Sequence, residues 1–183
     1  GVLTRHLVKQ TGHLTAVEID SRMVGYLQEE FAGQKNLDIV HEDFLKYDLS
    51  RNFGGQRLRI IGNLPYHVTT GILLQVLDEV RLAKSQINEA AIIDDFSIMI
   101  QKEVADRITC TTGNKKYGIL SVFVDTLCDS SIVLDVPPEA FSPRPKIMSS
   151  VIRLKPLKTP RYEVKDWDTF RLVVRSAFGK RRK

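Results

Sequence analysis

The chain has 183 residues, of which 43% are hydrophobic and 27% are charged, and its formal net charge is +5. This composition suits a single domain of ordinary size with a hydrophobic core. No apolar stretch is long enough to span a membrane, and the two well-separated cysteines indicate neither a disulfide framework nor a zinc site. The moderate positive charge is compatible with a polyanionic partner.

Both ends of the chain lie within predicted helices. Residues 2–8 carry apolar side chains at helical spacing directly after Gly1, which is typical of the second half of a strand–glycine loop–helix unit. A basic helix precedes the last residues, which are Lys180, Arg181, Arg182 and Lys183. We therefore expect a fragment cut at both ends, whose basic terminus is either a polyanion contact or a solvated tail.

Strand and helix patterns alternate along the chain. Helices are predicted over 2–8, over 21–31 with Ser21 as the cap, over 69–83 and over 102–109, while 117–127 fits either type. Strands are predicted over 13–20, 37–44, 58–62, 90–100 with an interruption at Asp94-Asp95, 131–136 and 149–154. This alternation predicts an α/β fold: a mostly parallel sheet flanked by helices, with an antiparallel strand near the C-terminal end.

The segment Asn63-Leu64-Pro65-Tyr66 follows directly on the apolar strand over 58–62. Pro65 has no N–H to donate and stiffens the backbone, so the strand ends here. An amide side chain, a free carbonyl and an aromatic ring then lie at the carboxyl end of a strand, where open α/β sheets bind ligands. The amide and the carbonyl can accept hydrogen bonds from an exocyclic amine while the ring stacks on a flat heterocycle. Taken alone, the same four residues also suit a simple turn.

Two earlier strands end in carboxylates, at Glu18 and Asp43. Glu18 lies 17 positions after Gly1, near the roughly 20-residue spacing at which a carboxylate reaches the ribose hydroxyls in nucleotide-binding units. Asp43 can accept from an adenine amino group while Ile19 or Phe44 covers the ring. Each acid alone is an ordinary cap or surface charge. Together with Asn63 they predict a sheet edge suited to an adenosine-containing cofactor and an amine-bearing substrate.

A proline-rich segment over 136–146 combines Phe141 with two cations, Arg144 and Lys146. Prolines reduce the entropy cost of holding a loop in one conformation, so Phe141 is expected to be presented stiffly. It could form the second side of a stack around a base flipped against Tyr66, with the cations near phosphates. The alternative is a hydrophobic plug in a surface loop.

These segments, in this order, resemble the rRNA adenine N6,N6-dimethyltransferase family of the KsgA type, which is related to the Erm resistance enzymes. The resemblance rests on Gly62 to Tyr66 and on the proline-rich segment, and it extends to the segment 101–107, to 117–122 and to Ala177-Phe178. It implies a Rossmann-like class I S-adenosylmethionine-dependent methyltransferase. Residues 1–158 would be the catalytic domain, truncated at its N-terminus, and 159–183 the start of a small helical C-terminal domain.

The resemblance also implies roles for single residues. Gly1, Glu18, Ile19, Asp43 and Phe44 would bind S-adenosylmethionine, with Asn63 shared between the cofactor and the target. Asn63, Leu64, Pro65, Tyr66 and Phe141 would hold and stack the target adenine, and RNA would be bound by Arg144, Lys146 and the basic run 180–183. No metal is required. The implied substrate is small-subunit rRNA in the pre-ribosomal particle, modified near its 3′ end by a cytoplasmic monomer.

Three alternatives remain open. An Erm-type enzyme would modify a large-subunit rRNA adenine with the same core, and the segment 101–104 together with the proline-rich loop favours the small subunit instead. A methyltransferase for protein glutamine or DNA would carry Pro where Leu64 stands. A non-catalytic nucleic-acid-binding relative, such as a mitochondrial transcription factor, would not need Asn63, Tyr66 and Phe141.

Overall fold

The computed structural model describes residues 1–65, 67–84 and 90–179, and the chain divides into two compact units, 1–48 and 49–183. The first unit contains helices α1 (Val2–Leu7) and α2 (Ser21–Glu30) and strands β1 (Leu14–Glu18) and β2 (Leu37–His41). The two strands pair in parallel from Leu14 opposite Leu37 to Glu18 opposite His41. Their carboxyl ends therefore meet at one edge of this small sheet.

The core of the first unit is formed by apolar side chains of α2 and of both strands, together with Val8 directly after α1 and Phe31 directly after α2. Val8, Leu27 and Phe31 are buried, and the partly buried Leu14, Leu37 and Ile39 pack against them. Helix α2 is capped by Asp20, whose Oδ1 accepts a hydrogen bond from the Arg22 backbone N–H at 2.9 Å. The expectation that Ser21 is the cap is wrong, because Ser21 is already the first helical residue and the capping carboxylate precedes it.

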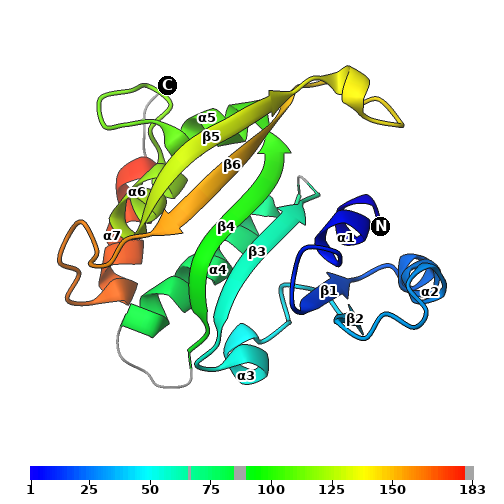
Figure 1. Ribbon diagram of the computed structural model, residues 1–183. Coiled ribbons are helices and arrows are strands. Elements are labelled where there is room, and N and C mark those ends of the chain that lie inside the picture. The colour runs from blue at the N-terminus through cyan, green and yellow to red at the C-terminus, as the bar shows by residue number, and fades with distance from the viewer. Residues whose placement is uncertain (66, 85–89, 180–183) are drawn as a thin grey trace. The chain divides into compact units, whose positions relative to one another are not determined.

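The second unit is a four-stranded sheet in the order β3-β4-β6-β5 (Figure 1). Strands β3 (Arg57–Asn63) and β4 (Ile92–Gln101) are parallel, and β6 (Ser149–Pro156) runs antiparallel to both β4 and β5 (Cys128–Val136). The helices are α3 (Leu49–Phe53), α4 (Thr69–Lys84), α5 (Lys102–Thr109), α6 (Ile119–Leu127) and α7 (Trp167–Gly179), and η1 (Pro138–Ala140) is a short 3-10 turn.

Helices α4, α5 and α6 lie on the same face of this sheet (Figure 1). Strand β3 alternates accordingly between a covered and an open face: Arg57, Arg59, Ile61 and Asn63 are exposed, and the positions between them are not. The largest fully buried side chains come from the strands and from the helices that cover them: Phe96, Ile98, Ile100, Ile152 and Leu154 of β4 and β6, Leu73 of α4 and Ile108 of α5. Asn63 thus lies on the face opposite the helices, at the carboxyl end of its strand.

The predicted α/β fold with parallel strands, flanking helices and a late antiparallel strand is confirmed. Two expectations were incomplete: 117–127 resolves into α6, and neither α3 nor η1 was predicted. The expected interruption at Asp94-Asp95 is a local irregularity and not a break: β4 continues through both residues, but its pairing with β3 shifts register there and skips Asp94. The sheet edge expected to be shared by Glu18, Asp43 and Asn63 stays a prediction.

Helix α7 lies in the same unit as α4 and α6. Arg171 forms an ion pair with Asp78 of α4, and Arg81 lies over the Trp167 ring at 5.9 Å from its centroid. The domain boundary after residue 158 stays a prediction. Within the part of the chain that the structure describes, no helix has the length and apolar character needed to cross a bilayer.

Candidate active site

A pocket of about 280 Å³ lies at the carboxyl end of β3. Its lining residues are Asn63, Leu64, Pro65, Met99, Phe141 and Ser149. This volume is at the lower limit of the roughly 300–1,000 Å³ of ordinary ligand pockets. The pocket therefore suits a single flat ring rather than a whole cofactor.

The backbone after β3 is held in a way that leaves two acceptors free. The Leu64 N–H donates to the Met99 carbonyl at 3.3 Å, which keeps the chain beside β4 for one residue beyond Asn63. The Pro65 carbonyl accepts from the Val68 N–H and from Thr69 Oγ1, each at 3.2 Å. Among the described residues, neither the Asn63 side-chain amide nor the Leu64 carbonyl has a hydrogen-bond partner, so both can accept from a ligand.

Phe141 enters the pocket from the loop between β5 and β6. The loop is folded tightly before it, since the Ala140 N–H donates to the Pro137 carbonyl at 3.0 Å and the Phe141 N–H to the Pro138 carbonyl at 3.2 Å. Arg144 forms an ion pair with Glu139 within the same loop, and Lys146 is exposed. The ring and the two cations therefore belong to the same loop.

Four of the five predicted target-binding residues line this pocket: Asn63, Leu64, Pro65 and Phe141. The fifth, Tyr66, lies outside the described residues, as does the basic run 180–183. Sequence reasoning missed Met99 and Ser149. Met99 pairs directly with Asn63 across β3 and β4, and Ser149 is a buried polar residue at the start of β6. Both residues can be identified only from how the strands pair, and strand pairing is a property of the tertiary structure.

Four of the predicted cofactor residues, Glu18, Ile19, Asp43 and Phe44, follow the carboxyl ends of β1 and β2 in the first unit, whereas Gly1 precedes α1 and Asn63 lies in the second unit. The Glu42 N–H donates to the Glu18 carbonyl at 3.0 Å, which holds these two strand ends together. Glu18 Oε1 accepts from the Ile19 and Asp20 backbone N–H groups at 2.8 and 2.9 Å. Asp43 Oδ1 accepts from the Leu45 N–H at 3.0 Å. In both carboxylates one oxygen is held by the backbone, and the second oxygen has no hydrogen-bond partner among the described residues.

These hydrogen-bond acceptors fit an adenosine moiety. The two carboxylates accept hydrogen bonds, as a ribose diol and an amino group require, and Ile19 next to them is 64% exposed and can cover a ring. Phe44 packs beside Tyr47 with a centroid distance of 6.4 Å. A Cβ at Gly1 would lie 2.6 Å from Glu30 Oε2, so a larger residue at the start of α1 would require the Glu30 side chain to move. In the described part of the chain, no group of three or more His, Cys, Asp or Glu side chains could hold a metal ion.

Comparison with known proteins gives one family over the whole chain. The family model described as ribosomal RNA adenine dimethylase matches residues 1–183. Ribosomal RNA small subunit methyltransferase A of Alkaliphilus oremlandii is 41% identical over 187 residues, and its counterpart in Xylella fastidiosa is 40% identical over 185 residues. Both alignments cover 100% of this chain, which spans only 62% and 66% of the length of these relatives.

Two solved structures are similar to this fold. A dimethyladenosine transferase from Plasmodium falciparum has a TM-score of 0.80 at 24% identity and covers 100% of this chain and 61% of its own. The 23S rRNA methyltransferase ErmE has a TM-score of 0.72 at 27% identity, covering 98% of this chain and 66% of its own. Both likenesses bear out the predicted arrangement of strands and helices.

Proposed function

This chain belongs to the ribosomal RNA adenine dimethylase family, and from that premise we propose that its protein transfers methyl groups from S-adenosylmethionine to the N6 amine of adenines in small-subunit rRNA. The observation that carries the proposal is the pocket in which Asn63, Leu64 and Phe141 come together. Two free acceptors and an aromatic ring suit an adenine with its exocyclic amine.

The chemistry asks for positioning more than for a strong base. The adenine amine is a poor nucleophile because its lone pair is delocalised into the ring. In the first transfer, Asn63 Oδ1 and the Leu64 carbonyl accept its two N–H bonds, which favours a pyramidal nitrogen whose lone pair points away from both acceptors. The nitrogen loses one proton when it gains a methyl group, so in the second transfer it donates only one hydrogen bond. The same oxygens stabilise the positive charge that develops on nitrogen during transfer, and holding the amine in place lowers the entropy cost of the reaction.

When bound, S-adenosylmethionine supplies a methyl group on a positively charged sulfur. Glu18 and Asp43 of this chain would hold its adenosine through the ribose hydroxyls and the amino group, with Ile19 and Phe44 covering the ring. Gly1 would approach its methionine part. Phe141 would stack the target base together with Tyr66, which lies outside the described residues.

The names of the family and of the relatives support dimethylation of adenine and a small-subunit substrate, and the finer assignments rest on the family resemblance alone. We infer two methylations per adenine, at adenines near the 3′ end of the small-subunit rRNA in the pre-ribosomal particle. Arg144, Lys146 and the basic run 180–183 would contact phosphates. A monomeric, cytoplasmic protein is part of the same proposal.

The test is methyl transfer from labelled S-adenosylmethionine by the full-length protein. Under-methylated small and large ribosomal subunits are offered side by side, and the product nucleosides are resolved. We expect dimethyladenosine in the small subunit alone. Label only in the large subunit would favour the second candidate, an Erm-type activity suggested by the likeness to ErmE. RNA binding without any label would indicate a non-catalytic relative.

A further inference from the structure

The loop that carries Phe141 is closed at its base by two cross-strand pairs. Val136 of β5 pairs with Ser149 of β6, and Asp135 pairs with Ser150 one step further from the loop. The second pair is joined through its side chains, since Ser150 Oγ donates to Asp135 Oδ1 at 2.6 Å. Ser150 is fully buried and Ser149 lines the pocket. These two cross-strand pairs therefore set where the loop leaves the sheet.

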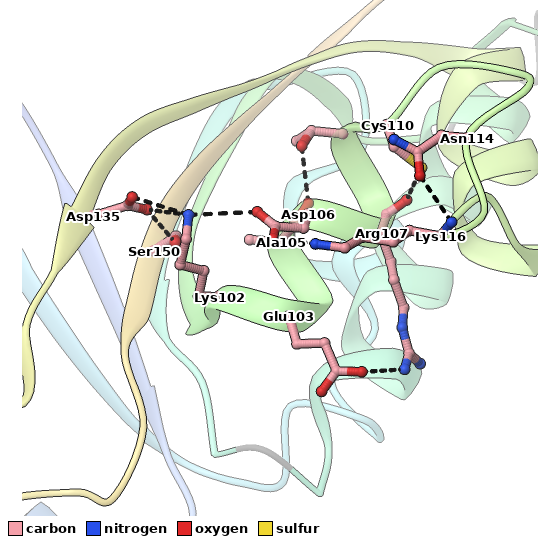
Figure 2. A network of polar contacts seen from close by, with 11 residues as sticks. Lys102, Glu103, Ala105, Asp106, Arg107, Cys110, Asn114, Lys116, Asp135 and Ser150 are labelled. Atoms are coloured by element: carbon pink, nitrogen blue, oxygen red, sulfur yellow. Dashed lines mark hydrogen bonds and ion pairs between the residues drawn. The ribbon is translucent and has the colours of Figure 1, made fainter.

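Lys102, the first residue of α5, contacts both stems of that loop. Its backbone N–H donates to the carbonyl of Met148, the last loop residue before β6, at 3.0 Å. Its ammonium group donates to both oxygens of Asp135, the penultimate residue of β5, at 3.1 and 2.9 Å. Figure 2 shows the Lys102 side chain pointing at Asp135 beside Ser150. One residue thus connects the stem that enters the loop with the stem that leaves it.

Further charges hold the ammonium group in place. Asp106, one helical turn along α5, lies 3.5 Å from Lys102 Nζ, and Lys116 Nζ donates to the other Asp106 oxygen at 2.7 Å (Figure 2). The hydrogen bond to Asp135 raises the pKa of Lys102. Hydrogen bonds from Ser150 and Lys102 lower the pKa of Asp135. Both groups are therefore charged across the neutral pH range.

A direct contact between Lys102 and RNA is the competing interpretation. Its side chain is 35% exposed, but two carboxylates already occupy its donors. The neighbouring pair Glu103–Arg107 shows the contrast, because it joins two exposed side chains on α5 alone and reaches no strand. The contacts of Lys102 reach Asp135 and Met148, where the loop meets the sheet.

We propose that Lys102 is a positioning residue that acts through Phe141: by holding Met148 and Asp135 it fixes the loop 137–148 and presents the Phe141 ring to the pocket. The effect on methyl transfer rests on the function proposed above, whereas the effect on the loop does not. Lys102 itself is not among the residues that line the pocket.

The test compares Lys102→Met with Lys155→Met in the full-length protein. Both substitutions remove an ammonium group and keep an unbranched side chain, and Lys155 is an exposed residue of β6. Hydrogen exchange is measured over 137–148, with α7 as an internal reference. We expect faster exchange over 137–148 in Lys102→Met alone. Asp135→Asn, which keeps an acceptor for Ser150, is expected to have the same effect and serves if Lys102→Met does not fold.

Kinetics separate positioning from a general loss of structure. Lys102→Met is expected to lower kcat/KM for RNA about 10- to 100-fold and to leave KM for S-adenosylmethionine unchanged. In a Phe141→Ala background the same substitution should have little further effect, because the ring that it positions is absent. Unchanged exchange over 137–148, or an equal loss of kcat/KM with and without Phe141, would overturn the inference. An inactive wild type would contradict the proposed function, while the exchange comparison would still decide the role of Lys102 at the loop.

Discussion

Asn63 is the residue on which the proposed chemistry depends most. It lies on the exposed face of β3, opposite Met99, and its amide has no partner among the described residues. An amide without a partner beside a pocket is available to a ligand. No hydrogen bond within the protein has to break before it binds one.

Asn63→Ala should therefore abolish most of the methyl transfer and leave folding intact. Loss of one preorganised polar group in an active site costs about 10²–10³-fold in kcat. The measurement is single-turnover transfer to under-methylated small subunits, with S-adenosylmethionine affinity measured in parallel. Equal loss of transfer and cofactor affinity would contradict the assignment of Asn63 to the target amine.

Met99 bears on the number of methyl groups that the pocket accepts. Its side chain is flexible and apolar, and it lines a pocket of about 280 Å³ together with Asn63. A second methylation requires room for the methyl group already on the amine. We expect the flexible Met99 side chain, which lines the pocket beside Asn63, to make this room.

Met99→Phe should favour the first methylation over the second. A larger, stiffer side chain reduces the space beside the amine, so monomethyladenosine should accumulate relative to dimethyladenosine. The nucleosides are resolved after partial reaction, and Met23→Phe, at an exposed position of α2 outside the pocket lining, is the matched control. An unchanged ratio would place the methyl-accepting space elsewhere.

At the scale of elements, β4 shows how an acidic pair is accommodated inside a central strand. Asp95 is buried, and its Oδ2 accepts from Arg59 of β3 at 3.0 Å and from Arg153 of β6 at 2.6 Å. The carboxylate thus connects three strands on the face opposite the helices. Burial by itself raises the pKa of Asp95, but hydrogen bonds from Arg153 and Arg59 outweigh it and the net pKa is lowered.

Asp95→Asn should make the protein less stable at pH 7 and less sensitive to acid. Because the folded-state pKa is lowered, the carboxylate contributes stability above the unfolded-chain value of about 3.9. That contribution is lost as the pH falls through the folded pKa. We expect about 1–2 kcal/mol of destabilisation at pH 7, shrinking below about pH 4, measured by urea unfolding at several pH values. Asp94→Asn, whose partner Arg57 is largely exposed, should have a smaller effect, and equal effects would argue against the three-strand connection.

At the scale of the whole molecule, the two sets of functional residues fall in different units. The carboxylates expected to bind the cofactor lie within residues 1–48, whereas the pocket lies within residues 49–183. Substitutions in one set should therefore affect one ligand more than the other.

Glu18→Gln should weaken S-adenosylmethionine binding and leave RNA affinity unchanged. Hydrogen bonds to charged groups contribute about 1.5–3 kcal/mol, which corresponds to about 10- to 100-fold in Kd. Calorimetric titration with the cofactor and filter binding with rRNA are compared with those of Glu29→Gln, an exposed glutamate of α2. A matching loss of RNA affinity would indicate general damage to the first unit.

Local patterns predicted most elements because each depends on neighbours in the chain. The apolar spacing over 69–83 and the alternation over 149–154 needed no distant partner, and α4 and β6 appear where expected. Helix α6 and strand β4 depend on distant partners. The apolar pattern of 117–127 fits a helix and a strand equally well. Asp94-Asp95 is tolerated in a strand because arginines of two other strands pair with Asp95.

The sequence by itself determined the fold class and the residue types of the site, since Asn63, Pro65 and Phe141 carry their chemistry wherever they are placed. Only the tertiary structure decided what shares a pocket with them. Met99 and Ser149 line it because of strand register, and Lys102 reaches Asp135 across 33 positions of the chain. Contacts between such distant residues depend on how strands pair and helices pack, and no local pattern encodes that.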